Sequence, residues 1–302
     1  CVLMLDGFNQ DLPALRKQIE EALSLLEQQT YVQRNGELYE YLTDEEKDVE
    51  QEIKNTEIES SDVAVELEKI VFDHVIKHRK IRYDENGQDY SFSRKLDDRL
   101  HGREYELAIH VVSPFHEHTD NEQMLRKNST YKADELFVIL PADERLMRDL
   151  LMYKRTEKYI RQNISTKQQE AVKRILTDKG FQNRERYDEL QQRIQNLMGK
   201  AKLLVAGADI EIGSEDAQKR VTRGFHDLIS RAYPNLRMLR DITYIENDIA
   251  KYLKQSKQGL FGNDTTSLAE SEQELLAFIQ SNNRSGVRTT LKNMLEKFER
   301  KP

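Results

Sequence analysis

Apolar residues recur at every third or fourth position between residues 12 and 28, a spacing that predicts an amphipathic helix. Leu15, Ile19 and Leu23 lie on its apolar face. Pro13 is compatible with the first turn, because the N–H group that proline lacks has no helical partner there.

A β-hairpin is predicted directly after this helix. Two β-prone runs, residues 31–33 and 38–42, flank Asn35-Gly36, a pair that readily adopts the positive φ angles of a tight turn. Thr43 and Glu46 then have the spacing of a capping box, so a charged helix begins there and extends to residue 54. The order helix, hairpin, helix is that of the C-terminal half of a winged-helix module.

The next segment combines a helix with strands. Residues 61–75 carry apolar side chains on one helical face, and a second hairpin joins residues 80–83 to residues 90–92. The runs at 105–112 and 135–140 are almost continuously apolar. That pattern is typical of central strands covered on both faces of a sheet.

From residue 143 the pattern changes to long polar helices. One helix is predicted at residues 143–163 and a second at 165–197, whose heptad-like stripe is interrupted by Gly180. The first helix ends at residue 163 and the second begins at residue 165, so the connection between them is very short. A short connection favours an antiparallel helical hairpin, which would project from the body or form an assembly surface. After strands within residues 203–212, Ser214 is predicted to cap a further helix.

A linker is predicted at residues 258–266, followed by two short helices at 271–280 and 287–298. We therefore predict a helix-rich α+β fold with four parts. These are a winged-helix-like unit at residues 1–58, a small α+β domain at 59–142, a long helical hairpin with short strands and helices at 143–257, and a linker with the truncated start of a second helix-turn-helix or winged-helix unit at 258–302.

The composition fits an intracellular, helix-rich chain. Charged residues make up 33% of the 302 residues and the mean hydropathy is −0.79, and no run approaches the roughly 18 apolar residues of a membrane span. The single cysteine, Cys1, excludes a disulfide framework and favours a reducing compartment. Both ends of the chain are interpreted as cuts from a longer polypeptide.

The net charge of −7 is unevenly distributed along the chain. Residues 1–70 hold 6 Lys and Arg against 18 Asp and Glu, a net charge of −12, and the remainder holds 41 against 36, a net charge of +5. Because the negative charges of its Asp and Glu side chains repel the phosphate backbone, the segment of residues 1–70 is better suited to contact with protein than with DNA.

The sequence carries no recognisable catalytic motif, and we predict that the segment is not an enzyme. A P-loop needs a glycine-rich loop that ends in Gly-Lys-Ser/Thr, and the nearest strings, at residues 198–201 and 205–208, lack the second glycine or the hydroxyl. No Gly-x-Ser-x-Gly nucleophile elbow is present. We expect no cofactor and no metal in this segment.

Two groups of histidines are the only candidates for a metal. His116 and His118, with His110 nearby, form one group, and His74 and His78 lie four residues apart on a predicted helix. Neither group has a third or fourth ligand at a fixed spacing, so solvated or hydrogen-bonded histidines are the favoured interpretation. A metal-dependent hydrolase that uses His116 and His118 stays a third hypothesis.

Several basic residues are candidates for contact with nucleic acid. A winged helix places a helix in the major groove and a wing on the backbone, but here Arg16 and Lys17 stand among glutamates and only Arg34 lies at the wing tip. Better candidates lie beyond residue 70, although they also fit solvated faces mixed with acids. They are Lys77, Arg79, Lys80, Arg82, Lys219, Arg220 and Arg223.

Several strings resemble the large P-loop protein of bacteriophage-exclusion (BREX) defence systems, the BrxC/PglY family. They are residues 31–36, 42–46, 52–55, 80–83, 105–107 and 295–302. The resemblance implies a bacterial, cytoplasmic protein in phage defence, with an ATP- and magnesium-binding AAA-like module upstream and assembly with other BREX components. No position here matches that module's nucleotide-binding motifs.

Our leading hypothesis is therefore a non-catalytic middle segment of a BrxC-like ATPase. It would contribute to self-assembly and would dock partner proteins or duplex DNA, with no contact to a membrane. The alternative is a DNA-binding module of the transcription-factor type, in which the winged helices read the sequence of bases.

Overall fold

The computed structural model describes residues 11–35, 38–163, 170–239, 247 and 269–298. The chain divides into two compact units, each made of segments that are distant in the sequence. We call Cys1–Val75 with Ala142–Leu197 the helical unit, and Ile76–Pro141 with Met198–Pro302 the sheet unit.

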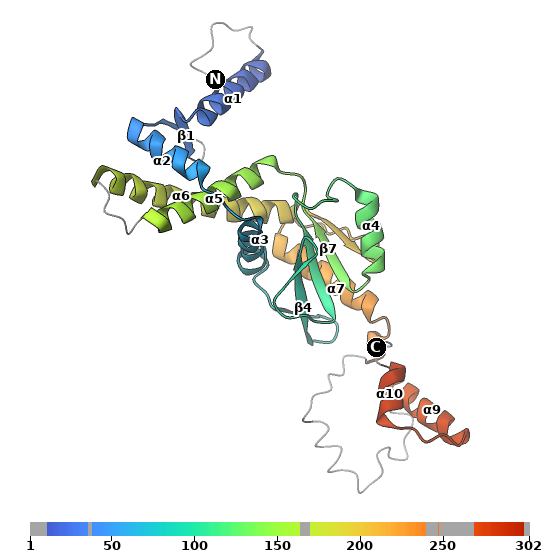
Figure 1. The fold of residues 1–302 in the computed structure, drawn as a ribbon. Helices are drawn as coiled ribbons and strands as arrows, with labels where there is room; N and C mark the ends of the chain where they lie inside the picture. Colours follow the sequence, from blue (N-terminus) through green and yellow to red (C-terminus); the bar gives the residue numbers. More distant parts are fainter. Residues whose placement is uncertain (1–10, 36–37, 164–169, 240–246, 248–268, 299–302) are drawn as a thin grey trace. The chain divides into compact units, whose positions relative to one another are not determined.

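The helical unit begins with the predicted helix, hairpin and helix (Figure 1). These are α1 (Leu12–Gln28), β1 (Val32–Asn35), β2 (Leu38–Tyr41) and α2 (Asp44–Asn55). The capping box that begins α2 is confirmed, since the Glu46 N–H donates to the Thr43 hydroxyl and the Thr43 N–H donates to the Glu46 carboxylate. The order of elements agrees with a winged-helix half, and the assignment to that class stays a prediction.

Three further helices belong largely to this unit. They are α3 (Ser60–Lys69), which continues as a π-helical segment (Ile70–Ile76), α5 (Glu144–Asn163) and α6 (Glu170–Gly199). Gly180 lies within α6, so the second long helix is continuous through it. The segment that joins α5 to α6 lies outside the described residues.

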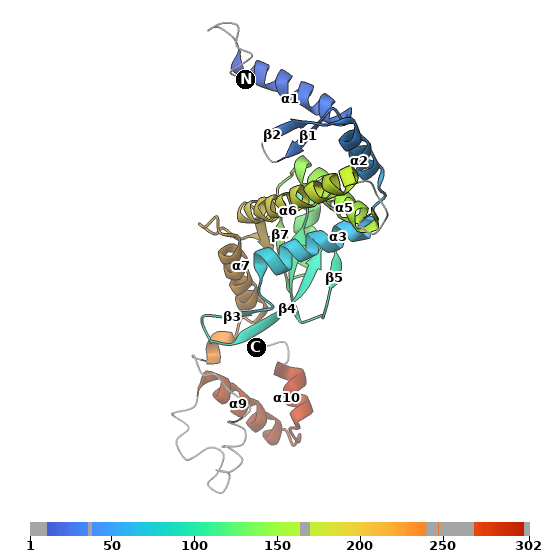
Figure 2. The same ribbon diagram turned by 90° about the vertical axis from the view of Figure 1, so that its left-hand side faces the viewer.

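The long helices pack against each other and against α2, side by side in Figure 2. Val49 and Ile53 of α2, Tyr159 of α5 and Leu176 of α6 form one buried cluster. The Asn183 side chain donates to the Tyr153 carbonyl at 3.1 Å. The predicted hairpin helices therefore share their apolar stripes with α2 inside this unit.

The sheet unit is built on a mixed sheet with the order β3-β4-β6-β7-β8-β9, and β5 also pairs with β4. Its strands are β3 (Lys80–Arg82), β4 (Asp89–Leu96), β5 (Arg99–His101), β6 (Leu107–Val112), β7 (Glu135–Ile139), β8 (Lys202–Val205) and β9 (Ala208–Asp209). Strands β4, β6 and β7 are parallel, and the other pairs are antiparallel. The structure thereby confirms the helix-rich α+β class.

Helices cover both faces of the central strands, as the apolar runs predicted. Helix α4 (Glu122–Tyr131) buries Leu125 against Phe137 and Leu204. Helix α7 (Ala217–Ala232) lies on the opposite face, where Gly224 approaches the side chains of Leu136 and Leu203. Successive residues of a strand point to opposite faces, so every residue of β6 and β7 is buried.

Two helix starts differ from the sequence prediction. Asp216, and not Ser214, caps α7, because the Asp216 carboxylate lies where it accepts from the Lys219 N–H at 2.8 Å. After α9 (Glu270–Arg284), α10 (Leu291–Phe298) begins four residues later than predicted. The Thr290 hydroxyl accepts from the Asn293 N–H there, which places the cap at residue 290.

A short 3₁₀ helix (Leu236–Leu239) follows α7. The predicted linker at residues 258–266 lies outside the described residues, as does most of the end of the preceding predicted part, whose helices are expected to extend to residue 257. The four predicted domains stay predictions.

Candidate functional site

The predicted DNA-contacting residues lie on two elements of the sheet unit. Lys80 and Arg82 belong to the edge strand β3, with Lys77 and Arg79 directly before it, and the other three belong to α7. The His226 ring on α7 donates from Nε2 to the Arg82 carbonyl at 2.8 Å. The fold therefore brings β3 and α7 together, which the sequence did not reveal.

These cations are not equally available to a ligand. Lys80 pairs with Asp89 at 2.5 Å. The guanidinium of Arg220 donates to three backbone carbonyls, those of Ala201, Ile212 and Ser214, and so holds the segment before α7. Of the three candidates on α7, Lys219 and Arg223 are exposed, and they lie one helical turn apart.

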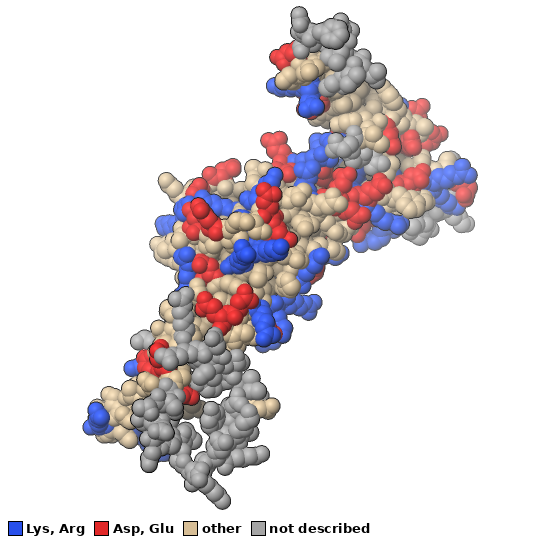
Figure 3. All heavy atoms as spheres, turned by 180° about the vertical axis from the view of Figure 1, so that it is seen from behind, with Lys and Arg blue, Asp and Glu red and all other residues tan. Residues whose placement is uncertain are grey.

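Basic and acidic side chains are intermixed over the described part of the face shown in Figure 3. Phosphate binding needs several cations that act together, and nearby carboxylates weaken their field. Contact with DNA through Lys77, Arg79, Lys80, Arg82, Lys219, Arg220 and Arg223 therefore stays a prediction.

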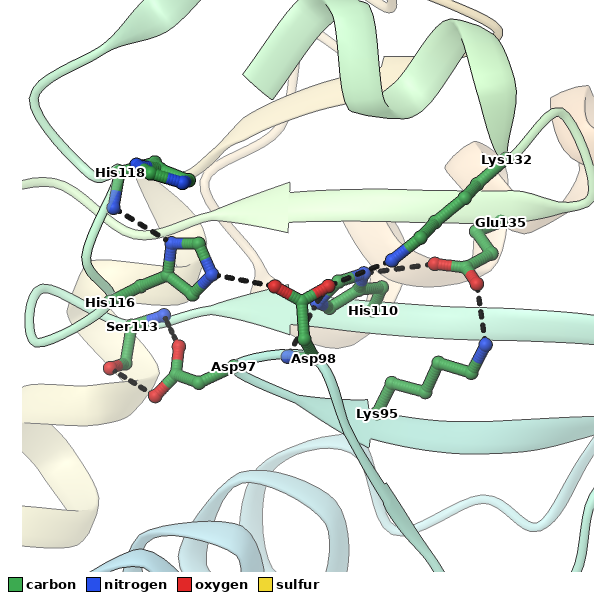
Figure 4. A network of polar contacts seen from close by, with 9 residues as sticks. All are labelled: Lys95, Asp97, Asp98, His110, Ser113, His116, His118, Lys132 and Glu135. Carbon is green, nitrogen blue, oxygen red and sulfur yellow. Dashed lines mark hydrogen bonds and ion pairs between the residues drawn. The ribbon is translucent and has the colours of Figure 1, made fainter. Parts of the chain in front are cut away.

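A network of charged and polar side chains lies on the face of the sheet that α4 covers (Figure 4). Lys95 and His110 are opposite each other on the parallel strands β4 and β6, and Glu135 begins β7 beside them. Lys95 Nζ lies 2.5 Å from Glu135 Oε1, and His110 Nδ1 lies 2.9 Å from Glu135 Oε2. The side chains of His110 and Glu135 are 1% and 3% exposed, so this contact is screened little by water.

The network continues to the carboxyl ends of β4 and β6. Asp97 and Asp98 follow β4 with φ angles of 48° and 65°, and the Asp97 carboxylate accepts from the backbone N–H and the hydroxyl of Ser113. The Asp98 carboxylate accepts from His116 Nε2 at 2.8 Å and from Lys132 Nζ at 2.7 Å. These contacts hold two left-handed residues in a turn that only the surrounding structure stabilises.

Backbone N–H groups fix the tautomers of two histidines. The Asp98 N–H donates to His110 Nε2, and the His118 N–H donates to His116 Nδ1. A ring nitrogen that accepts a hydrogen bond carries no proton, so each ring donates from its other nitrogen to a carboxylate. His110 donates to Glu135 and His116 donates to Asp98.

The electrostatics agree with this geometry. Burial opposes ionisation of both carboxyl groups, but hydrogen bonds and nearby cations outweigh it. His110 and Lys95 therefore lower the pKa of Glu135, and Lys132 and His116 hold the pKa of Asp98 well below its usual range. Both carboxylates are ionised at neutral pH.

This arrangement holds the ends of three strands together, and it engages the carboxylates of Asp97, Asp98 and Glu135 in hydrogen bonds. Both nitrogens of the His116 ring are engaged, so the ring could bind a metal only by giving up one of these contacts. Among the described residues, no group of three or more His, Cys, Asp or Glu side chains is placed to hold a metal ion. The hypothesis of a metal-dependent hydrolase gains no support from this part of the chain.

The comparison with protein families identifies the domain that contains this sheet. Residues 56–228 match the family model described as the BREX ATP-binding protein BrxC 4th domain with six-stranded beta sheet. The chain belongs to the BrxC family of BREX proteins. This match confirms the resemblance seen in the sequence, and the BrxC-type domain contains all the strands from β3 to β9 as well as the network.

The six strands named in that description agree with the path β3-β4-β6-β7-β8-β9, to which β5 adds a short edge. No solved structure matches the chain. In the described part of the BrxC-family chain, no helix is long and apolar enough to cross a membrane. Helices α1 and α2 with their hairpin precede the matched residues, and α9 and α10 follow them.

Proposed function

We propose that this chain is an assembly segment of a BREX ATP-binding protein, and that α1 is its docking helix. The observation that carries the proposal is that no residue of this 17-residue amphipathic helix is buried within the described part of the chain. Membership of the BREX system supports association with other components of that system.

The apolar face of α1 is incompletely covered. Leu12 remains 54% exposed, and Ile19 and Leu23 are only half-buried. Most of the stability of a helix of this length comes from tertiary packing of its apolar face. Complete burial of one such side chain is worth about 1.5–3 kcal/mol, so a partner on this face would be stabilising.

The partner that we propose is a second copy of the chain. Residues 1–70 carry a net charge of −12 and the remainder carries +5, so one copy attracts the other when the acidic end meets the basic part. Such a contact joins different surfaces of the two copies, which leads to a ring or a filament and not to a two-fold dimer. Exposed cations such as Lys219 and Arg223 are available for the acidic end.

We also propose that the segment contributes no catalysis, and that ATP and magnesium are bound by another part of the BrxC-type protein. The absence of a Gly-Lys-Ser/Thr loop in the sequence supports this proposal. The transcription-factor alternative is weaker, because Lys17 of the candidate recognition helix stands one turn from Glu21 at 3.9 Å.

The test compares two matched variants of α1, Ile19→Asp and Gln18→Asp. Both introduce the same charge into the middle of the helix, but Ile19 lies on the apolar face and Gln18 is an exposed polar residue. Sedimentation equilibrium would give the mass at about 0.1 M and about 1 M salt, where the Debye length is about 10 Å and about 3 Å.

We expect the wild type and Gln18→Asp to exceed the monomer mass of 35.6 kDa at low salt and to dissociate at high salt. Ile19→Asp should stay monomeric at both salt concentrations. A wild type that is monomeric throughout, or two variants that associate equally well, would refute the assignment of α1 as the docking helix.

A further inference from the structure

The helical unit contains a cavity of about 390 Å³ with an excess of cationic side chains in its wall. Six cationic residues from β1, α2, α5 and α6 line it: Arg34, Lys54, Arg145, Arg148, Arg155 and Arg186. Four carboxylates, those of Glu27, Glu50, Asp149 and Glu189, line it as well. The charge balance within this wall decides what the cavity can hold.

Two of the four carboxylates already have strong partners. Glu50 forms a buried ion pair with Lys179, which lies outside the wall. Asp149 pairs with Arg145 at 3.0 Å. Arg148 lies 3.7 Å from the same Asp149 carboxylate, and Arg145 also lies 3.9 Å from Glu189. Among the described residues, these contacts leave Arg155 and Arg186 without a carboxylate in an ion pair.

Arg186 has no counter-charge in contact with it among the described residues. Its one hydrogen bond goes to the neutral side chain of Asn183, and no carboxylate of the described residues forms an ion pair with it. Burial lowers the pKa of the Arg186 guanidinium, although Glu50, Asp149 and Glu189 act in the opposite direction from a distance. A guanidinium stays charged in proteins, and a desolvated charge is costly unless a counter-charge contacts it.

Arg155 contributes an unsatisfied donor to the same wall. Its Nε atom is buried and has no hydrogen-bond partner among the described residues. A guanidinium carries five N–H donors in a planar fork, which matches the oxygen atoms of a phosphate or a carboxylate. The cavity therefore lacks acceptors, and an anion would supply them.

We propose that this cavity binds a small, multiply charged phosphate ligand, with Arg155 and Arg186 as its principal donors. The volume lies within the range of about 300–1,000 Å³ that small-molecule sites occupy. Free pyrophosphate and the diphosphate of a nucleotide share this chemistry. The site is separate from the assembly surface that we propose on the apolar face of α1.

This site differs from a P-loop in how it holds phosphate. A P-loop uses the backbone N–H groups of a glycine-rich loop, whereas the donors here are side chains on two packed helices. Replacing one arginine therefore removes donors without changing the backbone. Methionine is a suitable replacement, because it keeps an unbranched chain of similar reach and removes the charge.

The experiment uses the full chain and the variants Arg186→Met, Arg155→Met and Arg174→Met. Arg174 is an exposed residue of α6 that does not line the cavity, so its variant is the matched control. Isothermal titration with inorganic pyrophosphate, at constant ionic strength, gives the affinity. ADP and adenosine are titrated in parallel to distinguish a free phosphate from a nucleotide as the ligand.

We expect pyrophosphate to bind the wild type and Arg174→Met equally well, and each cavity variant to bind at least tenfold more weakly. ADP that binds more tightly than pyrophosphate would identify a nucleotide, and equal affinities would identify the phosphate groups alone. Adenosine should not bind in either case.

Thermal unfolding without any anion provides the second measurement. If Arg186 lacks a counter-charge in the free protein, Arg186→Met should unfold at the same temperature as the wild type or higher. A large loss of stability in that variant would show that the carboxylates of the wall already balance Arg186, and would overturn the proposal. Equal pyrophosphate affinity in all four proteins would overturn it as well.

Discussion

Replacing Glu135 by glutamine tests whether the buried network stabilises the sheet unit. The substitution keeps the shape of the side chain and removes its charge. The Glu135 carboxylate now accepts from both Lys95 and His110, at 2.5 and 2.9 Å. A glutamine has one acceptor oxygen, so its NH₂ group must face one of these two donors.

The expected loss in the free energy of unfolding follows from the burial of the Lys95, His110 and Glu135 side chains. Breaking a buried ion pair costs about 3–5 kcal/mol because the remaining charge is left without a partner. Here the Lys95 side chain is 22% exposed, so water compensates part of its charge. We therefore expect a loss of about 2 kcal/mol, which lowers the melting temperature by roughly 4–8 °C for a unit of this size.

Urea unfolding followed by circular dichroism would measure the loss, and hydrogen exchange of the amides in β6 and β7 would assign it to the sheet unit. Glu117→Gln is the control, because Glu117 is exposed and has the same chemistry. The pKa of Glu135 is lowered in the folded state, so its contribution is complete above the unfolded pKa of about 4.3 and declines as the pH falls below it. A loss below about 0.5 kcal/mol at pH 7, or one equal to that of the control, would refute the reasoning.

Two further predictions concern the same unit. Folding also lowers the pKa of Asp98, and Lys132 is among the groups that cause this. The contribution of Asp98 to stability is therefore present above about pH 4 and is lost at lower pH. In acid-unfolding curves, Asp98→Asn should reduce the slope of stability against pH below that value. An unchanged slope would contradict this. In urea unfolding, Gly207→Ala should lower the free energy of unfolding more than Gly102→Ala does. Both glycines have positive φ, but only at Gly207 would the new Cβ atom lie 2.2 Å from Thr130 Oγ1. Equal losses of stability would show that backbone strain alone matters.

Local patterns in the sequence determined most of the secondary structure. The apolar spacing predicted α1 with its observed bounds, and the capping box placed the start of α2 correctly. The apolar runs identified β6 and β7 as central strands. The helix features depend on contacts between residues three or four apart, and the central strands depend on burial of both faces of the sheet. Both produce a pattern of apolar residues that can be recognised in the sequence itself.

Tertiary structure decided which distant residues meet. Lys95 and Glu135 are 40 residues apart, and the pairing register of three parallel strands places them on one face of the sheet. Arg155 and Arg186 gave no signal in the sequence, because an arginine on a polar helix usually faces water. Burial, and with it the need for a counter-charge, arises only when the helices that carry them pack together, and no spacing along the chain encodes that contact.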